Sequence, residues 1–215
     1  MAQIKLIIGD KNLSSWSLRP WIILEHAGIP FTEENIKLNR PDSRDALKQK
    51  SPSGLVPCLS HGDLVIWDSL AIAEYLNDAY PEKQLWPADI NARAIARAIS
   101  AEMHSGFTAL RTVWPMNVTR RDMNHLTTGG VQRDIDRIND LWTMARKKYG
   151  KPAGGTFLFG AFSIADAMFA PVVSRLVTYG PVALSAEASA YRDMMIALPA
   201  FKKWEDGARL EIGNT

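Results

Sequence analysis

The first eighty residues alternate between two patterns of apolar positions. Short apolar runs bounded by turn residues are typical of buried strands, and the stretches between them carry apolar side chains three or four residues apart, as amphipathic helices do. This alternation of strands and helices indicates an α/β fold. The predicted elements are, in order, strand 3–9, helix 16–27, strand 29–38, helix 42–50, a β-hairpin over 56–67 and helix 68–80.

The rest of the chain is helical in pattern. Residues 81–87, PEKQLWP, contain two prolines and predict a linker. The sequence therefore predicts an α/β domain over 1–80, a linker, and an all-α domain over 88–215. The predicted helices of this second domain are 91–113, 130–149, 162–180, 187–198 and 199–211.

The helix over 162–180 has the clearest start signal in the chain. Ser163 and Asp166 have the spacing of a capping box, in which each side chain accepts a backbone N–H at the start of the helix. The apolar run behind them is long enough for a central buried helix. Pro171 lies inside that run and is expected to kink it.

Composition narrows the classes of function. The 215 residues are 47% hydrophobic, and 25 Lys+Arg against 23 Asp+Glu leave a net charge of +2, too small to favour nucleic-acid binding. No apolar run approaches the ~18 residues that a membrane helix needs. The one cysteine, Cys58, allows no intramolecular disulfide, which fits a cytoplasmic protein, and it is expected in the core. The four histidines are scattered, so no metal is predicted.

Candidate chemistry begins with a cluster of hydroxyls between the first predicted strand and the first predicted helix. Ser14, Ser15 and Ser17 lie where the helix should start. A helix N-terminus exposes unpaired N–H groups and a partial positive charge, so it stabilises an anion and lowers the pKa of a thiol placed there. A serine hydroxyl could donate to that thiolate, or it could only cap the helix.

Two further stretches have the same double interpretation. Val56–Pro57 precedes the third predicted strand, so the backbone of Val56 could face a ligand or simply start the strand. Asp68 and Ser69 start the next helix as caps, or they bind an α-amino acid, with Asp68 holding its ammonium and Ser69 its carboxylate. Taken together, the three stretches suit a ligand with a central thiol and an α-amino acid at one end, which describes glutathione.

Over nearly its full length the chain resembles the cytosolic glutathione transferase family. The resemblance rests on SSWSLRPW, SPSGLVPCL, WDSLAIAEYL and FSIADAMFAP, and SSWSLR is similar to the SSCSWR pattern of the zeta class, to which maleylacetoacetate isomerases belong. It implies a thioredoxin-like N-terminal domain followed by an all-helical C-terminal domain. It also implies a homodimer that acts in detoxification and a cis Val56–Pro57 bond.

The resemblance also implies roles for individual residues. Ser14 is implied as the hydroxyl that stabilises the thiolate of glutathione, with Ser15 as the alternative. Gly54 and Leu55 stand where relatives can offer polar side chains near the glycyl carboxylate, and Lys48, Arg40 or Arg44 could bind it instead. The implied glutathione-binding residues are Ser14, Ser15, Trp16, Lys48, Val56, Pro57, Asp68 and Ser69. The implied electrophile-site residues are Thr108, Arg111, Thr112, Trp114 and Arg175.

The expected function is therefore that of a glutathione transferase, with glutathione as co-substrate and a small electrophile as second substrate. A glutathione-dependent isomerase of the maleylacetoacetate type is the first alternative, although Trp16 stands where the zeta pattern has a cysteine. A non-catalytic glutathione-binding member of the fold is the second alternative.

Overall fold

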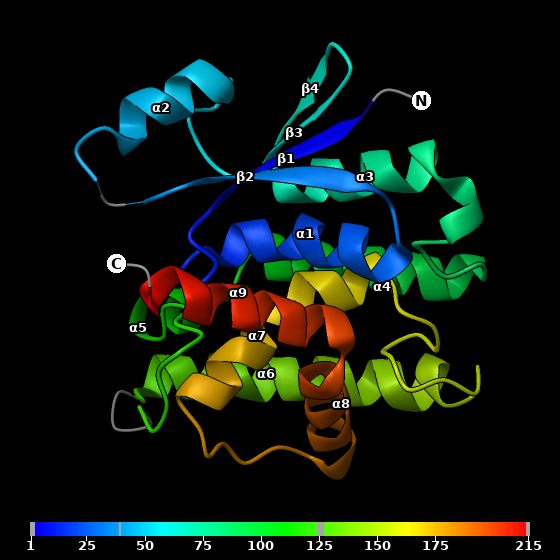
Figure 1. The fold of residues 1–215 in the computed structure, drawn as a ribbon. Helices are drawn as coiled ribbons and strands as arrows, with labels where there is room; N and C mark the ends of the chain where they lie inside the picture. The colour runs from blue at the N-terminus through cyan, green and yellow to red at the C-terminus, as the bar shows by residue number, and fades with distance from the viewer. Residues whose placement is uncertain (1–2, 39, 124–126, 214–215) are drawn as a thin grey trace.

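A four-stranded mixed sheet forms the centre of the first part of the protein (Figure 1). The computed structural model describes residues 3–38, 40–123 and 127–213. The strands stand in the order β2-β1-β3-β4, with β1 and β2 parallel and the other two pairs antiparallel. Their bounds are Ile4–Gly9 for β1, Phe31–Ile36 for β2, Cys58–His61 for β3 and Leu64–Ile66 for β4.

The helices α1 (Ser15–Ala27) and α3 (Ser69–Ala79) lie on the face of the sheet that is turned towards the rest of the protein (Figure 1). Alternate side chains of β1 point to this face and join the main core. Ile7 points to the opposite face, where it packs with Leu47 of α2 (Ser43–Lys50). The two-residue period of the strand thus supplies two apolar layers, and α1 is enclosed between the sheet and the second part of the chain.

The second part is entirely helical in its long elements. The helix α7 is buried along almost its whole length and contacts α1, as expected for a central helix. The fold is therefore a thioredoxin-like domain followed by a helical domain, as predicted. The helices are α4 (Ile90–Ser105), α5 (Thr108–Val113), α6 (Gly129–Ala145), α7 (Ile164–Thr178), α8 (Ala186–Ala197) and α9 (Pro199–Gly213).

The prediction of one helix over 91–113 is wrong. The chain breaks into α4 and α5 at Gly106 and Phe107, and Phe107 has a left-handed backbone with φ of 60°. A Cβ at Gly106 would lie 2.8 Å from the carbonyl oxygen of Glu102, so only glycine fits this close turn. The predicted helix over 130–149 likewise ends at Ala145 and continues as a π-helical turn.

The capping box of α7 is confirmed. Oδ2 of Asp166 accepts hydrogen bonds from the backbone N (2.8 Å) and Oγ (2.9 Å) of Ser163, and Oδ1 accepts from the backbone N of Leu158 at 3.1 Å. The carboxyl group is completely buried, and burial raises its pKa to about 6 despite these donors. Pro171 lies within α7. None of the helices described is long and apolar enough to cross a bilayer.

Candidate active site

The start of α1 is fixed from the helical domain. The carbonyl oxygen of Asn12 accepts a hydrogen bond from the backbone N of Val118 at 3.1 Å, and the carbonyl oxygen of Lys11 accepts one from Nε1 of Trp204 at 2.8 Å. The loop that leads from β1 into α1 is therefore held from both sides. This contact sets the position of the serines that follow it.

The two candidate serines have different surroundings. Ser14 is the N-cap of α1: its Oγ accepts from the backbone N of Ser17 at 3.4 Å and donates to Oγ of Ser17 at 2.7 Å. Ser15 is the first residue of the helix, and its hydroxyl has no hydrogen-bond partner among the residues described. Both residues are buried, at 5% and 8% exposure. The start of α1 thus carries two candidate hydroxyls, and that of Ser14 is already hydrogen-bonded as the helix cap.

Val56 lies just before β3, and the β1–β3 register, with Ile7 opposite Cys58, directs it towards the end of β1. The Val56–Pro57 bond is cis, as the family resemblance implied. The backbone N–H and C=O of Val56 make no hydrogen bond to any residue described, because the ladder between β1 and β3 begins only at Cys58. A backbone N–H and C=O without partners can hydrogen-bond to the peptide backbone of a ligand.

Asp68 and Ser69 occupy the start of α3, as predicted. Oδ1 of Asp68 caps the helix by accepting from the backbone N of Leu70 (3.0 Å) and of Ala71 (3.5 Å). The carboxylate remains accessible, since its side chain is 55% exposed. The hydroxyl of Ser69 is completely buried and has no partner within the described part of the chain. A buried hydroxyl without a partner costs about 1–3 kcal/mol.

Trp16 stands at the centre of a stack of cationic side chains. The guanidinium carbon of Arg19 lies 4.2 Å from the centroid of the indole ring, and that of Arg111 lies 4.8 Å from it. The imidazole of His104 packs edge-on against the same ring at 5.3 Å. Helices α1, α4 and α5 therefore meet at one tryptophan.

Arg19 is completely buried, and none of its three guanidinium nitrogens has a hydrogen-bond partner in the described residues. Burial lowers its pKa well below the usual value, and the positive charges of Arg111 and Arg175 lower it further. The carboxylate of Asp68 acts in the opposite direction as the smallest cause. Positive charge is thus concentrated beside the helix end, and it would be compensated by an anion.

The residues expected to bind the electrophile divide into two groups. Thr108 and Thr112 are exposed on α5, whereas Trp114 is buried and stacks on Tyr179 with ring centroids 4.9 Å apart. Arg175 is buried in α7, where Nε donates to the carbonyl oxygen of Trp114 at 2.7 Å, and burial lowers its pKa to about 9.

Arg111 is partly buried, so its exposure is intermediate between those of the two groups. Its Nε donates to the carbonyl oxygen of Gly106 at 2.9 Å, while one face of the guanidinium meets Trp16. The candidates for the glycyl carboxylate, Lys48, Arg40 and Arg44, are all exposed on or just before α2. Cys58 is completely buried, as expected of a core residue, and burial raises its pKa.

Two residues of this region were not identified as site candidates from the sequence. Arg19 was only placed at the helix end, although its spacing of three from Trp16 puts both side chains on one helix face. His104 was counted as one of four scattered histidines, and its contacts with Trp16 and Asp68 are between distant parts of the chain. No local sequence pattern could have indicated the contacts of His104.

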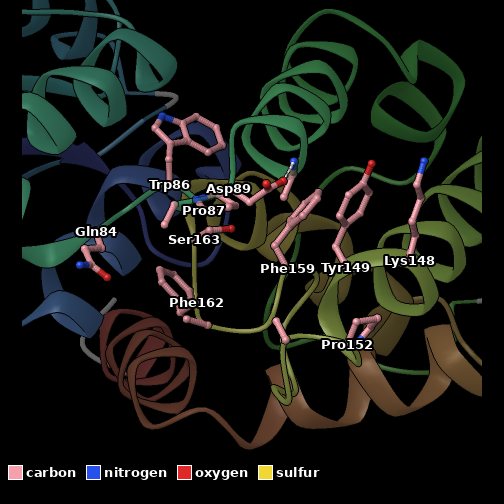
Figure 2. Close-up of a pocket in the computed structure, with 14 residues that line it drawn as sticks. Gln84, Trp86, Pro87, Asp89, Lys148, Tyr149, Pro152, Phe159, Phe162 and Ser163 are labelled. Carbon is pink, nitrogen blue, oxygen red and sulfur yellow. Dashed lines mark hydrogen bonds between the residues drawn. The ribbon is translucent and has the colours of Figure 1, made fainter.

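A cavity of about 480 Å³ lies elsewhere, between the linker, the start of α4 and the segment before α7. Figure 2 shows the aromatic rings of Trp86, Tyr149, Phe159 and Phe162 around it. None of the predicted glutathione or electrophile residues lines this cavity. Among the residues described, no group of three or more His, Cys, Asp and Glu side chains could hold a metal ion, and His125 lies outside those residues.

Comparison with known proteins identifies the first domain. Residues 13–79 match the family model "Glutathione S-transferase, N-terminal domain". Residues 13–79 therefore form a glutathione S-transferase N-terminal domain. This confirms the resemblance inferred from the serine, Val56–Pro57 and Asp68–Ser69 motifs.

The chain is similar to zeta-class proteins. It is 37% identical to glutathione S-transferase Z2 of Arabidopsis thaliana over 105 residues, which is 48% of this chain and 47% of that protein. It is 28% identical to a probable maleylacetoacetate isomerase of Caenorhabditis elegans over 80% of this chain and 79% of that protein. The first of these matches spans about half the length of the curated relative.

The fold is shared over the whole chain. A glutathione transferase homolog from Burkholderia, solved with bound glutathione, superimposes with a TM-score of 0.71 and 24% identity, covering 96% of this chain and 98% of that one. At this identity the likeness establishes the fold. The activity has to be argued from the site itself.

Proposed function

We propose that this protein is a glutathione transferase that presents the glutathione thiolate at the start of α1 to a small electrophile. The observation that carries the proposal is a row of polar groups left without partners where the family motifs occur. These are the hydroxyl of Ser15, the backbone of Val56 and the hydroxyl of Ser69. The family model, and a structural neighbour solved with glutathione, support glutathione as the molecule that completes them.

Each end of glutathione has a proposed binding partner. The γ-glutamyl ammonium binds the accessible carboxylate of Asp68, and the γ-glutamyl α-carboxylate binds the hydroxyl of Ser69 at the positive end of α3. The cysteinyl backbone pairs with Val56. The glycyl carboxylate, which lies beyond it, reaches Lys48.

The sulfur then lies at the N-terminus of α1, where a hydroxyl donor and the helix dipole favour the thiolate over the thiol. We propose Ser14 as the donor, because its proton can turn from Oγ of Ser17 to the sulfur while Ser14 continues to cap the helix. Ser15 is the alternative, because its hydroxyl has no competing partner among the described residues. Catalysis follows from binding the charged form of the nucleophile more tightly than the neutral form.

The test is an ultraviolet titration of the thiolate of bound glutathione in wild type, Ser14→Ala and Ser15→Ala. We expect the acting serine, when removed, to raise the apparent thiol pKa by about one unit, equal to about 1.4 kcal/mol. Ser185→Ala is the matched control, because Ser185 caps α8 through the backbone N of Ala188 and lies outside the predicted site. An unchanged pKa in both Ser14→Ala and Ser15→Ala would refute the proposed activation.

A second candidate function is the glutathione-dependent isomerisation of a maleyl-type dicarboxylate. The buried and unpartnered guanidinium of Arg19, with Arg111 beside it, favours an electrophile that carries an acidic group. In this reaction glutathione adds to the substrate double bond and is eliminated again after rotation. Turnover of such a substrate should decrease in Arg111→Met, whereas a wild-type protein that conjugates electrophiles without isomerising dicarboxylates would exclude the isomerase.

We further propose that the protein is a cytoplasmic homodimer that detoxifies electrophiles. The side chains of Leu64, Val65 and Trp67 are 38–49% exposed along and just after the edge strand β4, and offer apolar surface to a second copy. Light scattering of the purified protein would show the dimer.

The non-catalytic alternative has a separate test. Glutathione binding without turnover of any electrophile would favour it.

A further inference from the structure

His104, in the last turn of α4, reaches the carboxylate proposed to hold the ammonium of glutathione. Its Nε2 lies 3.1 Å from Oδ2 of Asp68, while Oδ1 of the same carboxylate caps α3. The imidazole is 25% exposed, and its Nδ1 is buried without a partner among the described residues. A neutral imidazole in this position is best satisfied with its proton on Nε2, which then donates to Asp68.

The charged groups around the ring of Trp16, which His104 contacts, include two arginines and Asp134 of α6, which accepts from the backbone N of Leu110 at 2.8 Å and acts on Arg111. Arg19 on α1 and Arg111 on α5 stack on Trp16, whose ring also contacts His104, and Arg111 donates to the carbonyl oxygen of His104 at 3.5 Å. Arg175 on α7 adds a third guanidinium to the same group. Asp68 is the carboxylate in direct contact with His104, at 3.1 Å from Nε2, so its charge is the one that a proton on His104 would neutralise.

We propose that His104 is a positioning residue for Asp68 and that protonation of His104 opposes glutathione binding. This inference rests on the proposed function, because it takes the γ-glutamyl ammonium as the group that Asp68 binds. Neutral His104 fixes the carboxylate through Nε2–H and leaves it a full negative charge. Protonated His104 places a positive charge beside the same oxygen and competes with the ammonium. The proton and the ligand are thus linked through one carboxylate.

The linkage has a definite sign. Glutathione affinity should increase as the pH rises, because neutral His104 leaves the carboxylate of Asp68 to the ammonium. By reciprocity, the bound ligand should make His104 harder to protonate and move its ionisation to lower pH. A histidine with only a structural role would show neither effect.

The test is calorimetric titration with S-methylglutathione, which keeps the ammonium but has no thiol to ionise. Between about pH 7.5 and pH 5.5 we expect binding to wild type to weaken roughly five- to tenfold. His104→Gln keeps an uncharged donor and should bind as wild type does at high pH, with no weakening at low pH. His61→Gln is the matched control: His61 pairs with the hydroxyl of Tyr75 (2.7 Å), so its loss should leave the pH dependence intact.

A second measurement uses wild type alone, so it does not depend on how the variants fold. The imidazole resonances of His104, followed by NMR with and without S-methylglutathione, should show the midpoint of ionisation move to lower pH when the ligand is bound. Affinity that does not change with pH, a midpoint that stays or rises, or an unchanged pH dependence in His104→Gln would overturn the role of His104. Absence of binding at every pH would instead contradict the proposed function.

Discussion

The starts of α3 and α7 look alike in sequence and differ in what surrounds them. Each combines a serine with an aspartate at a helix N-terminus. At α7, Asp166 accepts from three donors and Ser163 is fully engaged, so the buried box is closed. At α3, Asp68 is half-exposed and the buried hydroxyl of Ser69 has no partner among the described residues. The first arrangement stabilises a fold, and the second leaves hydrogen-bonding capacity for a ligand.

The buried arginines show the same contrast. Arg175 donates Nε to the carbonyl oxygen of Trp114 and Nη1 to that of Pro171, so its charge is held by the protein. Arg19 is equally buried and has no acceptor within the described residues. An unpaired buried charge is costly, so the presence of Arg19 near the start of α1 suggests that a bound anion pairs with its guanidinium. The two arginines thus differ in their hydrogen bonds although both are buried.

The largest expected change in stability follows from breaking the Ser163–Asp166 capping box of α7. Asp166→Ala removes the acceptor of three buried donors and should lower the free energy of unfolding by about 3–5 kcal/mol. Urea unfolding followed by circular dichroism measures this loss. Below the unfolding transition the variant should bind glutathione as wild type does. A loss below about 1 kcal/mol would remove the distinction between the two helix starts.

The same carboxyl group predicts a pH dependence of stability. Burial raises its folded-state pKa to about 6, above the unfolded value, so the folded state binds the proton more tightly. The stabilisation from this proton is fully present below the unfolded pKa and is lost as the pH rises to about 6, roughly 3 kcal/mol at most. Urea unfolding across this range should show the decrease in wild type. In Asp166→Asn the decrease should be smaller by that amount, and identical pH profiles would contradict the assignment.

Replacement of the unpartnered arginine should change stability in the opposite direction. Arg19→Met removes a buried charge without breaking a hydrogen bond, so the free energy of unfolding should rise by about 1–3 kcal/mol. Turnover of an acidic electrophile should fall in the same variant. The control is Arg175→Met, which loses two hydrogen bonds and should be less stable than wild type. Equal destabilisation in both variants would show that Arg19 is structural.

The sequence predicted the parts of the fold that depend on local signals. Gly28 ends α1 with a left-handed backbone, and the Ser163–Asp166 spacing marks the start of α7, because each signal lies within a few residues. The break between α4 and α5 was not predictable in this way. Apolar spacing continues through Gly106, and the helix ends there because the turn brings the backbone against Glu102.

Some residues of the candidate site could be predicted from local sequence patterns, and others could not. Asp68 and Ser69 were identifiable because helix caps have a local pattern. The cluster of Trp16, Arg111 and His104 forms only when α1, α4 and α5 come together, so no spacing in the sequence could indicate it. Whether a polar group is satisfied is likewise a property of the folded chain. That property distinguishes the start of α3 from the start of α7.

The most direct measurement compares Ser69→Ala with Ser163→Ala in glutathione affinity and in free energy of unfolding. Ser69→Ala should weaken glutathione binding at least about tenfold and leave stability unchanged or slightly higher, because it removes an unpartnered buried hydroxyl. Ser163→Ala should cost about 1 kcal/mol of stability and leave glutathione binding unchanged. Wild-type affinity for glutathione in Ser69→Ala would contradict the account.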